Sequence, residues 1–286
     1  MTLVDPEGPA VSQLELDRRA FRRRQSARSI LIGAGSTILF GAIAWLSLAN
    51  SPGWSAVQSS FFDPVVALEA LPRVWGGFLV NLQVLVFASL GVAVLATILA
   101  VLRTLRGPVW APLRALAAVY TDLFRGTPLI IVLYLVGFGI PTIVGQRIPE
   151  ILLGTIALTL TYSAYVAEVI RAGIEAVHPS QRLAARALGF SYGQSMRIVV
   201  FPQAIRKVTP ALMNDFISMQ KDVGLVSVIG AVDAVRSAQI ETARFADFTP
   251  YILAGVLFVL LAWPMIRLTD WVTARMQRRE QMGAAL

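Results

Sequence analysis

The chain has 286 residues, of which 56% are hydrophobic and only 15% are charged, and its mean hydropathy is +0.66. This composition excludes an ordinary soluble domain and predicts an integral membrane protein, because several apolar runs reach the roughly 20 residues that span a bilayer. The absence of cysteine excludes disulfides, thiol catalysis and cysteine-bound metals. The net charge of +8 does not indicate nucleic-acid binding, since the positive residues flank apolar runs and no nucleic-acid-reading module is present.

The N-terminal part of the chain predicts one helix that is separate from the rest. Residues 1–28 form a polar, basic segment, and an apolar span is expected at 29–50. A twin-arginine export signal is disfavoured, because this apolar run is long for such a signal and more spans follow it. Residues 51–73, rich in Pro and Gly, predict an external loop with a short surface helix.

A transmembrane domain is expected over 74–271, followed by a basic tail over 272–286. Its five apolar runs lie at about 76–102, 128–144, 151–170, 209–231 and 250–266. In this arrangement 20 of the 25 Lys and Arg residues lie on one side of the membrane, four lie on the other and one lies within a span. By the positive-inside rule, this asymmetry predicts an all-α protein of six spans with both termini in the cytoplasm.

The long cytoplasmic loop 175–207 contains signals for two short helices. Ser180 is expected to be the N-cap of the first helix, and Gly189 its stop, because glycine tolerates the left-handed conformation. Ser191 is expected to cap a second helix that reaches Val200 and that Pro202 closes. Two short helices that meet at a glycine predict a compact knob that a partner can approach closely.

This loop resembles the Glu-Ala-Ala loop of bacterial ABC importer permeases, in which a Gly follows three residues later and Ile-x-Leu-Pro nine residues after that. The matching coupling residues are Leu183, Ala184, Ala185, Gly189 and Pro202. The spacing is kept, but Leu183 replaces the Glu, which at position N3 after Ser180 would complete a capping box. The resemblance implies that the loop docks onto an ATPase; the alternative is an ordinary amphipathic surface helix.

Three further segments resemble polar amino acid permeases, namely Tyr120–Leu129, Tyr165–Ile174 and Lys221–Gly230. The resemblance implies the five-helix core of a type I importer, here preceded by one extra helix, in the bacterial plasma membrane. It also implies a permease dimer of identical or different subunits, two ATPase subunits and an extracytoplasmic solute-binding protein. The chain has no Walker phosphate loop, so ATP and Mg²⁺ are expected on the partner ATPase, and no cofactor on this chain.

The fifth apolar run is the candidate solute path, because it carries polar residues that lipid-facing helices avoid. These residues are Asn214, Asp215, Gln220, Lys221 and Asp222. We expect them to face a wet cavity and to offer donors and acceptors to a zwitterionic amino acid. The alternative is a structural ion pair between Lys221 and Asp215 or Asp222.

A candidate hinge precedes the third span, where Arg125, Gly126, Thr127 and Pro128 place a charge, a flexible joint and a proline in sequence. Pro128 disfavours a regular helix upstream of it. A plain helix-start cap is the alternative reading of the same four residues.

Other function classes fit the sequence less well. A secondary transporter would use Lys221, Asp222 and Asp215 for ion coupling, but such proteins often show two similar halves, and no convincing internal repeat is visible. A membrane enzyme is disfavoured because no nucleophile–base pair is evident. The single histidine, His178, is expected to be a solvated loop residue, not a metal ligand. Within the importer class, a sugar or peptide permease is the alternative to an amino acid permease.

Overall fold

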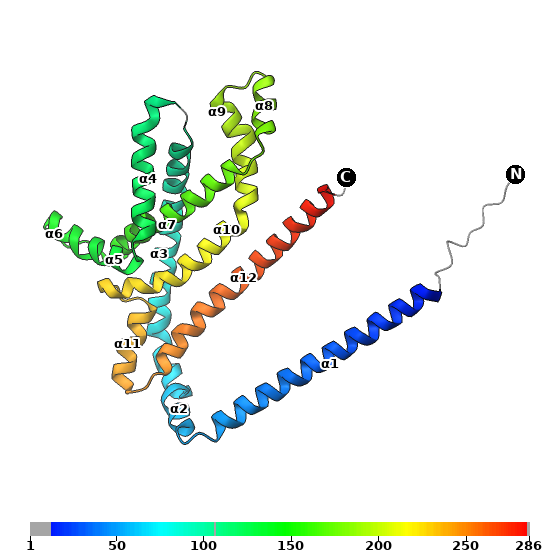
Figure 1. The fold of residues 1–286 in the computed structure, drawn as a ribbon. Coiled ribbons are helices and arrows are strands. Elements are labelled where there is room, and N and C mark those ends of the chain that lie inside the picture. The colour runs from blue at the N-terminus through cyan, green and yellow to red at the C-terminus, as the bar shows by residue number, and fades with distance from the viewer. Residues whose placement is uncertain (1–12, 106, 285–286) are drawn as a thin grey trace. The chain divides into compact units, whose positions relative to one another are not determined.

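The computed structural model describes residues 13–105 and 107–284, and these residues form helices and no strand, as predicted (Figure 1). Residues 1–12 of the predicted N-terminal segment and residues 285–286 of the predicted tail lie outside the described part. The chain divides into two units, Met1–Ser59 and Ser60–Leu286.

The first unit contains the predicted extra helix. Helix α1 (Gln13–Ala49) carries an apolar stretch of 22 residues, Arg28–Ala49, which is long enough to cross a bilayer. The side chains of this stretch that are described are exposed, as expected of a helix that faces lipid. Trp45 contacts Trp54 edge-on, with ring centroids 6.2 Å apart, where α1 leads into α2 (Trp54–Phe61).

The second unit begins with α3 (Pro64–Thr104), which starts earlier than the predicted domain boundary at residue 74. The predicted loop over 51–73 is therefore wrong beyond α2. Asp63 caps α3 by accepting hydrogen bonds from the backbone amides of Val65 (2.8 Å) and Val66 (3.2 Å). Pro64 occupies the first turn, where its missing N–H leaves no helical bond unmade, so this proline starts a helix instead of marking a loop.

The remaining helices follow in chain order. They are η1 (Pro108–Trp110), α4 (Ala111–Gly126), α5 (Leu129–Tyr134), the π-helical turn η2 (Leu135–Gly139), α6 (Ile140–Val144), α7 (Glu150–Glu175), α8 (Pro179–Ala187), α9 (Tyr192–Gln194), the π-helical turn η3 (Ser195–Val200), α10 (Phe201–Asp222), η4 (Val223–Ile229), α11 (Ala234–Phe245) and α12 (Thr249–Ala284). The predicted basic tail continues α12 through Ala284.

Four helical segments are long and apolar enough to cross a membrane: Arg28–Ala49, Trp54–Thr104, Glu150–Glu175 and Thr249–Met276. Two bent pairs add up to two more spans, α4 with α5–α6, bent by 106°, and the stretch Tyr192–Ile229 with α11, bent by 56°. The described residues therefore contain four to six candidate spans. The predicted six is the upper end of that range.

The core of the second unit forms where α3 and α7 pack together, and small residues at this contact permit the close approach. Ala88, Ala96, Ala157 and Ala167 are buried there. Gly91 meets the side chain of Thr159 so closely that an added Cβ would lie 2.8 Å from its Oγ1. Helices in membranes associate through such small residues, because close backbone approach supplies the van der Waals contact.

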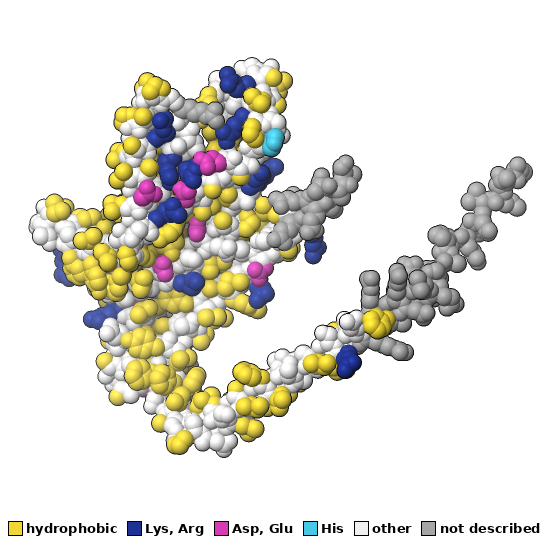
Figure 2. All heavy atoms as spheres, in the orientation of Figure 1, with side chains coloured by type: hydrophobic (Ala, Val, Ile, Leu, Met, Phe, Trp, Pro, Cys, Tyr) yellow, Lys and Arg dark blue, Asp and Glu magenta, His cyan; other side chains and the backbone are white. Residues whose placement is uncertain are grey.

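The second unit has two different ends. In Figure 1, α8 and α9 lie at one end, beside the start of α4, and α11 lies at the other. Figure 2 shows Lys, Arg, Asp and Glu side chains gathered toward the end with α8 and α9, and a largely apolar surface elsewhere. A polar end next to an apolar body is the arrangement expected of a helical membrane protein with one elaborated loop.

Candidate functional site

The predicted two-helix knob is present, but its first helix is capped differently. The N-cap of α8 is His178, whose Nδ1 accepts a hydrogen bond from the backbone amide of Ser180 at 3.2 Å. The prediction that Ser180 is the N-cap is therefore wrong, and position N3 is Gln181, not Leu183. Leu183 therefore does not stand at the position where a Glu would complete a capping box with the N-cap residue. His178 is exposed, as predicted.

The turn between the two short helices has the predicted chemistry. Gly189 adopts a left-handed φ of 83°, and its amide donates to the Arg186 carbonyl at 3.0 Å. The Phe190 amide donates to the Ala185 carbonyl at 3.1 Å, which completes a Schellman motif. Ser191 and Gln194 then form a reciprocal capping box at the start of the second helix.

The prediction that Pro202 closes the second helix is wrong. The helical stretch continues from Tyr192 through the π-helical turn η3 into α10, which ends at Asp222, and η4 extends it to Ile229. The wider π-helical turn ends at Val200, two residues before the proline, and local changes of this kind accommodate the missing N–H and the ring. One helical element therefore leads from the knob into the body of the bundle.

The knob is fastened to the ends of α3 and α7 by side chain–backbone hydrogen bonds. Arg182 donates to the Ile174 carbonyl (2.5 Å), Lys207 to the Ala176 carbonyl (2.8 Å) and the Tyr192 hydroxyl to the Thr104 carbonyl (2.9 Å). These carbonyls lie at or near helix C-termini, where cationic donors are favourable. The knob itself is thus tied to the bundle at two points, and Lys207 of α10, beyond the knob, adds a third tie.

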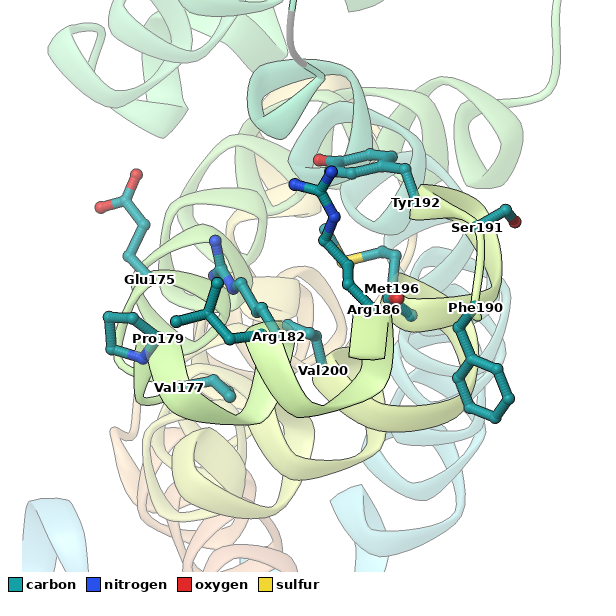
Figure 3. Close-up of a pocket in the computed structure, with 12 residues that line it drawn as sticks. Glu175, Val177, Pro179, Arg182, Arg186, Phe190, Ser191, Tyr192, Met196 and Val200 are labelled. Carbon is teal, nitrogen blue, oxygen red and sulfur yellow. The ribbon is translucent and has the colours of Figure 1, made fainter. Parts of the chain in front are cut away.

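A groove of about 550 Å³ lies in the knob between α8 and the α9–η3 stretch (Figure 3). Its walls include Arg182, Leu183, Arg186, Tyr192 and Met196. The predicted coupling residues differ in their exposure at this groove. Leu183 and Ala184 are exposed, whereas Ala185 is only 3% exposed and packs inside the knob.

A second cavity, of about 500 Å³, lies in the body of the bundle where three segments distant in sequence meet. The α4–α5 junction contributes Arg125 through Leu129, α7 contributes Thr161, Tyr162 and Tyr165, and α10 contributes Asp215, Ser218 and Asp222. The structure therefore unites the predicted hinge with two of the five predicted path residues.

The cavity wall holds acceptors that the protein does not fully satisfy. Asp222 accepts a 2.7 Å hydrogen bond from the Tyr162 hydroxyl. Among the described residues, no partner lies within hydrogen-bond distance of the buried Asp215 Oδ2 or of Thr161 Oγ1. Buried polar atoms are usually paired, so the two unpaired oxygens distinguish this wall from an ordinary helix contact.

Sequence reasoning missed the contribution of α7, although a signal for the α10 face was available. Asp215, Ser218 and Asp222 stand three and four residues apart, the spacing that puts side chains on one helix face. Tyr162 and Thr161 lie in an apolar run whose pattern does not single them out. Only the packing of α7 against α10 brings them to the cavity.

The other three predicted path residues lie elsewhere. Gln220 is fully buried, its Nε2 donates to the Phe258 carbonyl of α12 at 3.4 Å, and its Oε1 has no partner within the described part of the chain. Asn214 and Lys221 are exposed and do not line the cavity. Within the described residues Lys221 forms no salt bridge, so the alternative ion pair with Asp215 or Asp222 is not made in this chain.

The four predicted hinge residues form a sharp bend of 106° between α4 and α5–α6. The Thr127 hydroxyl donates to the Leu123 carbonyl at 2.8 Å, and Pro128 is the N-cap residue of α5 with an extended ψ of 134°. Pro128 stands at the start of α5 without a side-chain hydrogen bond that caps the helix.

An ion cluster borders the cavity. Glu168 on α7 is 2.5 Å from Arg103 of α3 and 2.5 Å from Arg171, and the Arg125 guanidinium lies 3.9 Å from it. Arg171 also pairs with Glu175. Because Arg103 and Arg171 already hold the Glu168 carboxylate, most of the donors of Arg125 remain available at the cavity wall.

A polar network at the opposite end was not predicted. Asn81 donates to Asp233 Oδ2 (2.9 Å) and to the Val223 carbonyl (2.9 Å), and it accepts from the Ala234 amide (3.0 Å). All three bonds are buried: two join α3 to the start of α11, and the bond to Val223 joins α3 to the start of η4. Nearby, the fully buried Glu241 pairs with Arg73 and Arg244.

Comparison with known proteins agrees with this architecture. Residues 109–279 match the family described as "Binding-protein-dependent transport system inner membrane component". The chain is 36% identical over 202 residues to the arginine transport system permease protein ArtQ of Bacillus subtilis (strain 168), covering 70% of this chain and 90% of ArtQ. It is 33% identical over 203 residues to the probable glutamine ABC transporter permease protein GlnM of the same strain, covering 71% and 92%.

Solved structures give the same result. A crystal structure of an amino acid ABC transporter with histidines matches with a TM-score of 0.67 and 34% identity, over 74% of this chain and 98% of that chain. The MetNI methionine ABC transporter in an inward-facing conformation matches in fold, with a TM-score of 0.60 and 20% identity, over 71% of this chain and 95% of that chain. With the family match covering more than half of its residues, the chain belongs to the binding-protein-dependent transport system inner membrane components, the permease subunits of ABC importers.

Proposed function

We propose that this chain is the membrane-spanning subunit of an ATP-driven importer of polar amino acids in the bacterial plasma membrane, with both termini cytoplasmic. The names of the relatives, for arginine and for glutamine transport, support the solute class. The distribution of Lys and Arg around the apolar runs supports the orientation.

The observation that carries the proposal is the continuous helical stretch from Tyr192 to Asp222. Its first turn belongs to the knob and its last turn to the wall of the cavity. A displacement of the knob by a partner is thus passed to Asp215 and Asp222 through one element. Mechanical continuity between a docking surface and a solute cavity is what alternating access driven by a separate ATPase requires.

The charges of the cavity fit a zwitterion. Arg125 stands on one wall, and Asp215 and Asp222 stand on another. A guanidinium pairs well with an α-carboxylate, and a carboxylate pairs well with an α-ammonium group. We propose that the cavity lies on the solute path, with Asn214, Gln220 and Lys221 on neighbouring faces of the same helix.

The proposed assembly contains two ATPase subunits, a second permease subunit that is identical or different, and an extracytoplasmic solute-binding protein. The ATPase binds ATP and Mg²⁺ in this assembly, since this chain has no Walker phosphate loop. The knob, with Leu183, Ala184, Ala185 and Gly189 at or near its tip and Pro202 at its base, is the proposed contact with the ATPase.

The test is uptake of a panel of labelled amino acids by cells that carry this permease with its neighbouring ATPase and binding protein, with and without ATP depletion. Uptake of one polar amino acid that stops on ATP depletion is the expected result. Uptake that survives ATP depletion but collapses with the ion gradient would overturn the proposal and point to ion coupling at Asp215 and Asp222.

A further inference from the structure

The knob, His178 to Val200, has an outward face that is apolar where a surface helix is ordinarily polar. Leu183 is 66% exposed and Leu188 is 76% exposed, and Ala184 and Ala187 between them are exposed as well. At 100° per residue, three of these side chains and that of Leu188, the C-cap residue of α8, cover one continuous arc of the helix. The opposite arc, around Ala185, packs inside the knob.

The charges of the knob have a single sign. Residues 178–200 include Arg182, Arg186 and Arg197 and contain no Asp or Glu. Arg182 is used within the chain, where it donates to the Ile174 carbonyl. Arg186 is exposed and stands at the groove beside Tyr192 (Figure 3). Glu175, at the edge of the groove, is held by Arg171 and so does not offer a free carboxylate.

We infer that the partner of the knob presents an apolar surface bordered by carboxylates, and that Leu183 and Leu188 contact the apolar part while Arg186 pairs with an acid. This inference rests on the proposed function, in which the partner is the ATPase subunit. It adds the chemistry of the contact. A knob without any acid selects an ATPase with acidic residues around its socket and rejects one whose socket is cationic, because unpaired like charges at an interface are costly.

The lipid surface is a poorer occupant than a protein. Membrane binding by an interfacial helix scales with the apolar area that it buries, and such helices usually carry large apolar side chains along many turns. Helix α8 has nine residues, and two of the four side chains on its outward face are alanines. Small side chains between two leucines permit the close approach of another protein surface.

The first experiment measures binding of the ATPase that copurifies with the wild-type permease to four variants in detergent. Leu183→Glu is expected to weaken binding at least tenfold, because it places a carboxylate against an apolar and acidic surface. Leu183→Met is expected to stay within about threefold of wild type, because it keeps the apolar contact. Arg186→Glu is expected to weaken binding at least tenfold, whereas Arg206→Glu, exposed on α10 outside the knob, is the matched control.

These variants distinguish a failure of the proposed function from a failure of the inferred contact chemistry. If no ATPase associates with the wild-type chain, the proposed function itself fails. If the wild type binds an ATPase and Leu183→Glu binds it equally well or more tightly, the inferred contact chemistry is wrong. Leu183 is exposed in the free chain, so its variants should fold normally, and a thermal unfolding curve for each verifies this.

The second experiment uses the absence of cysteine in the chain. A single Leu183→Cys variant is reacted with a water-soluble maleimide in membranes, with and without the ATPase, and Gly193→Cys on the second helix serves as the comparison. Fast reaction without the ATPase and at least tenfold slower reaction with it is the expected result. Slow reaction of the cysteine in the absence of the ATPase would show that lipid covers the face. An equal reaction rate with and without the ATPase would show that the ATPase does not cover it. Either result would overturn the inference.

Discussion

The Tyr162 hydroxyl donates a 2.7 Å hydrogen bond to Asp222 Oδ2 and thereby ties the middle of α7 to the last turn of α10. Asp222 is the last residue of α10, which continues the helical stretch that begins in the knob at Tyr192. The bond holds this carboxylate at the cavity wall in one orientation. Any displacement of α10 relative to α7 must stretch or break this hydrogen bond. Its length therefore changes when the cavity wall moves.

Removal of this hydroxyl by Tyr162→Phe should lower solute uptake several-fold and also lower the stability of the second unit, because Asp222 loses its hydrogen bond. A hydrogen bond to a charged group contributes about 1.5–3 kcal/mol, and the phenylalanine ring fills nearly the same space. Uptake rate and thermal unfolding of the purified complex are the two measurements. Uptake equal to wild type would show that the orientation of Asp222 does not matter for transport.

Asp215→Asn should reduce uptake at least tenfold and leave assembly with the ATPase unchanged. Asp215 lines the cavity, and its buried Oδ2 has no hydrogen-bond partner among the described residues, so no described residue pairs with this oxygen of the carboxylate. The substitution keeps the shape of the side chain and removes the charge. Asp122→Asn, at an exposed position of α4, is the matched control and should transport normally.

Lys221→Met tests a residue that the structure places outside the cavity. Lys221 is exposed within a span predicted from the sequence, and an ionisable side chain there requires a wet surface or a partner subunit. Reduced uptake with normal permease assembly is the outcome expected of a residue on the solute path. Normal uptake would remove Lys221 from that path.

Local signals in the sequence predicted the knob well. Gly189 is left-handed and Ser191 caps a helix, because both features depend on residues only a few positions apart. The cap at His178 was missed because an imidazole rarely takes the place of Ser or Asp at this position. The continuation of the helix through Pro202 was missed because a proline ordinarily ends a helix. The π-helical turn that accommodates this proline has no recognisable signal in the sequence.

The cavity was predicted only in part, because its walls come from three segments that the sequence keeps apart. The polar residues of the fifth apolar run were identified, but the sequence did not say that Asp215 and Asp222 face the cavity while Gln220 points to α12. Likewise, nothing in the pattern around Arg125 indicated its approach to Glu168. Such contacts between helices depend on crossing geometry, which hydropathy does not encode.

Glu168→Gln should destabilise the second unit, because it removes the charge that Arg103 and Arg171 share. The loss leaves two guanidinium groups close together in a partly buried place, at a cost of about 2 kcal/mol after allowance for the exposed fraction of the side chains. Thermal unfolding in detergent measures the effect. Glu175→Gln is the control, since Glu175 is 61% exposed and its loss should shift the unfolding temperature little.

The neighbouring glycines Gly76 and Gly77 provide the sharpest test of the packing at the end opposite the knob. A Cβ added to Gly77 would lie 2.3 Å from the backbone carbonyl oxygen of Asp233, whereas one added to Gly76 meets nothing within 4 Å. The Asp233 backbone cannot retreat easily, because its side chain is fixed by Asn81 and it caps α11. Gly77→Ala should therefore force α3 and α11 apart.

We expect Gly77→Ala to cost about 1–3 kcal/mol, the usual range for overpacking, and to lower the unfolding temperature and the yield of folded permease. Gly76→Ala should be neutral or slightly stabilising, since alanine is favoured over glycine inside a helix. The two variants differ by one position and have the same composition, so helix propensity cancels between them. Equal stability of the two would mean that α3 and α11 are not in the contact that the Asn81–Asp233 bond defines.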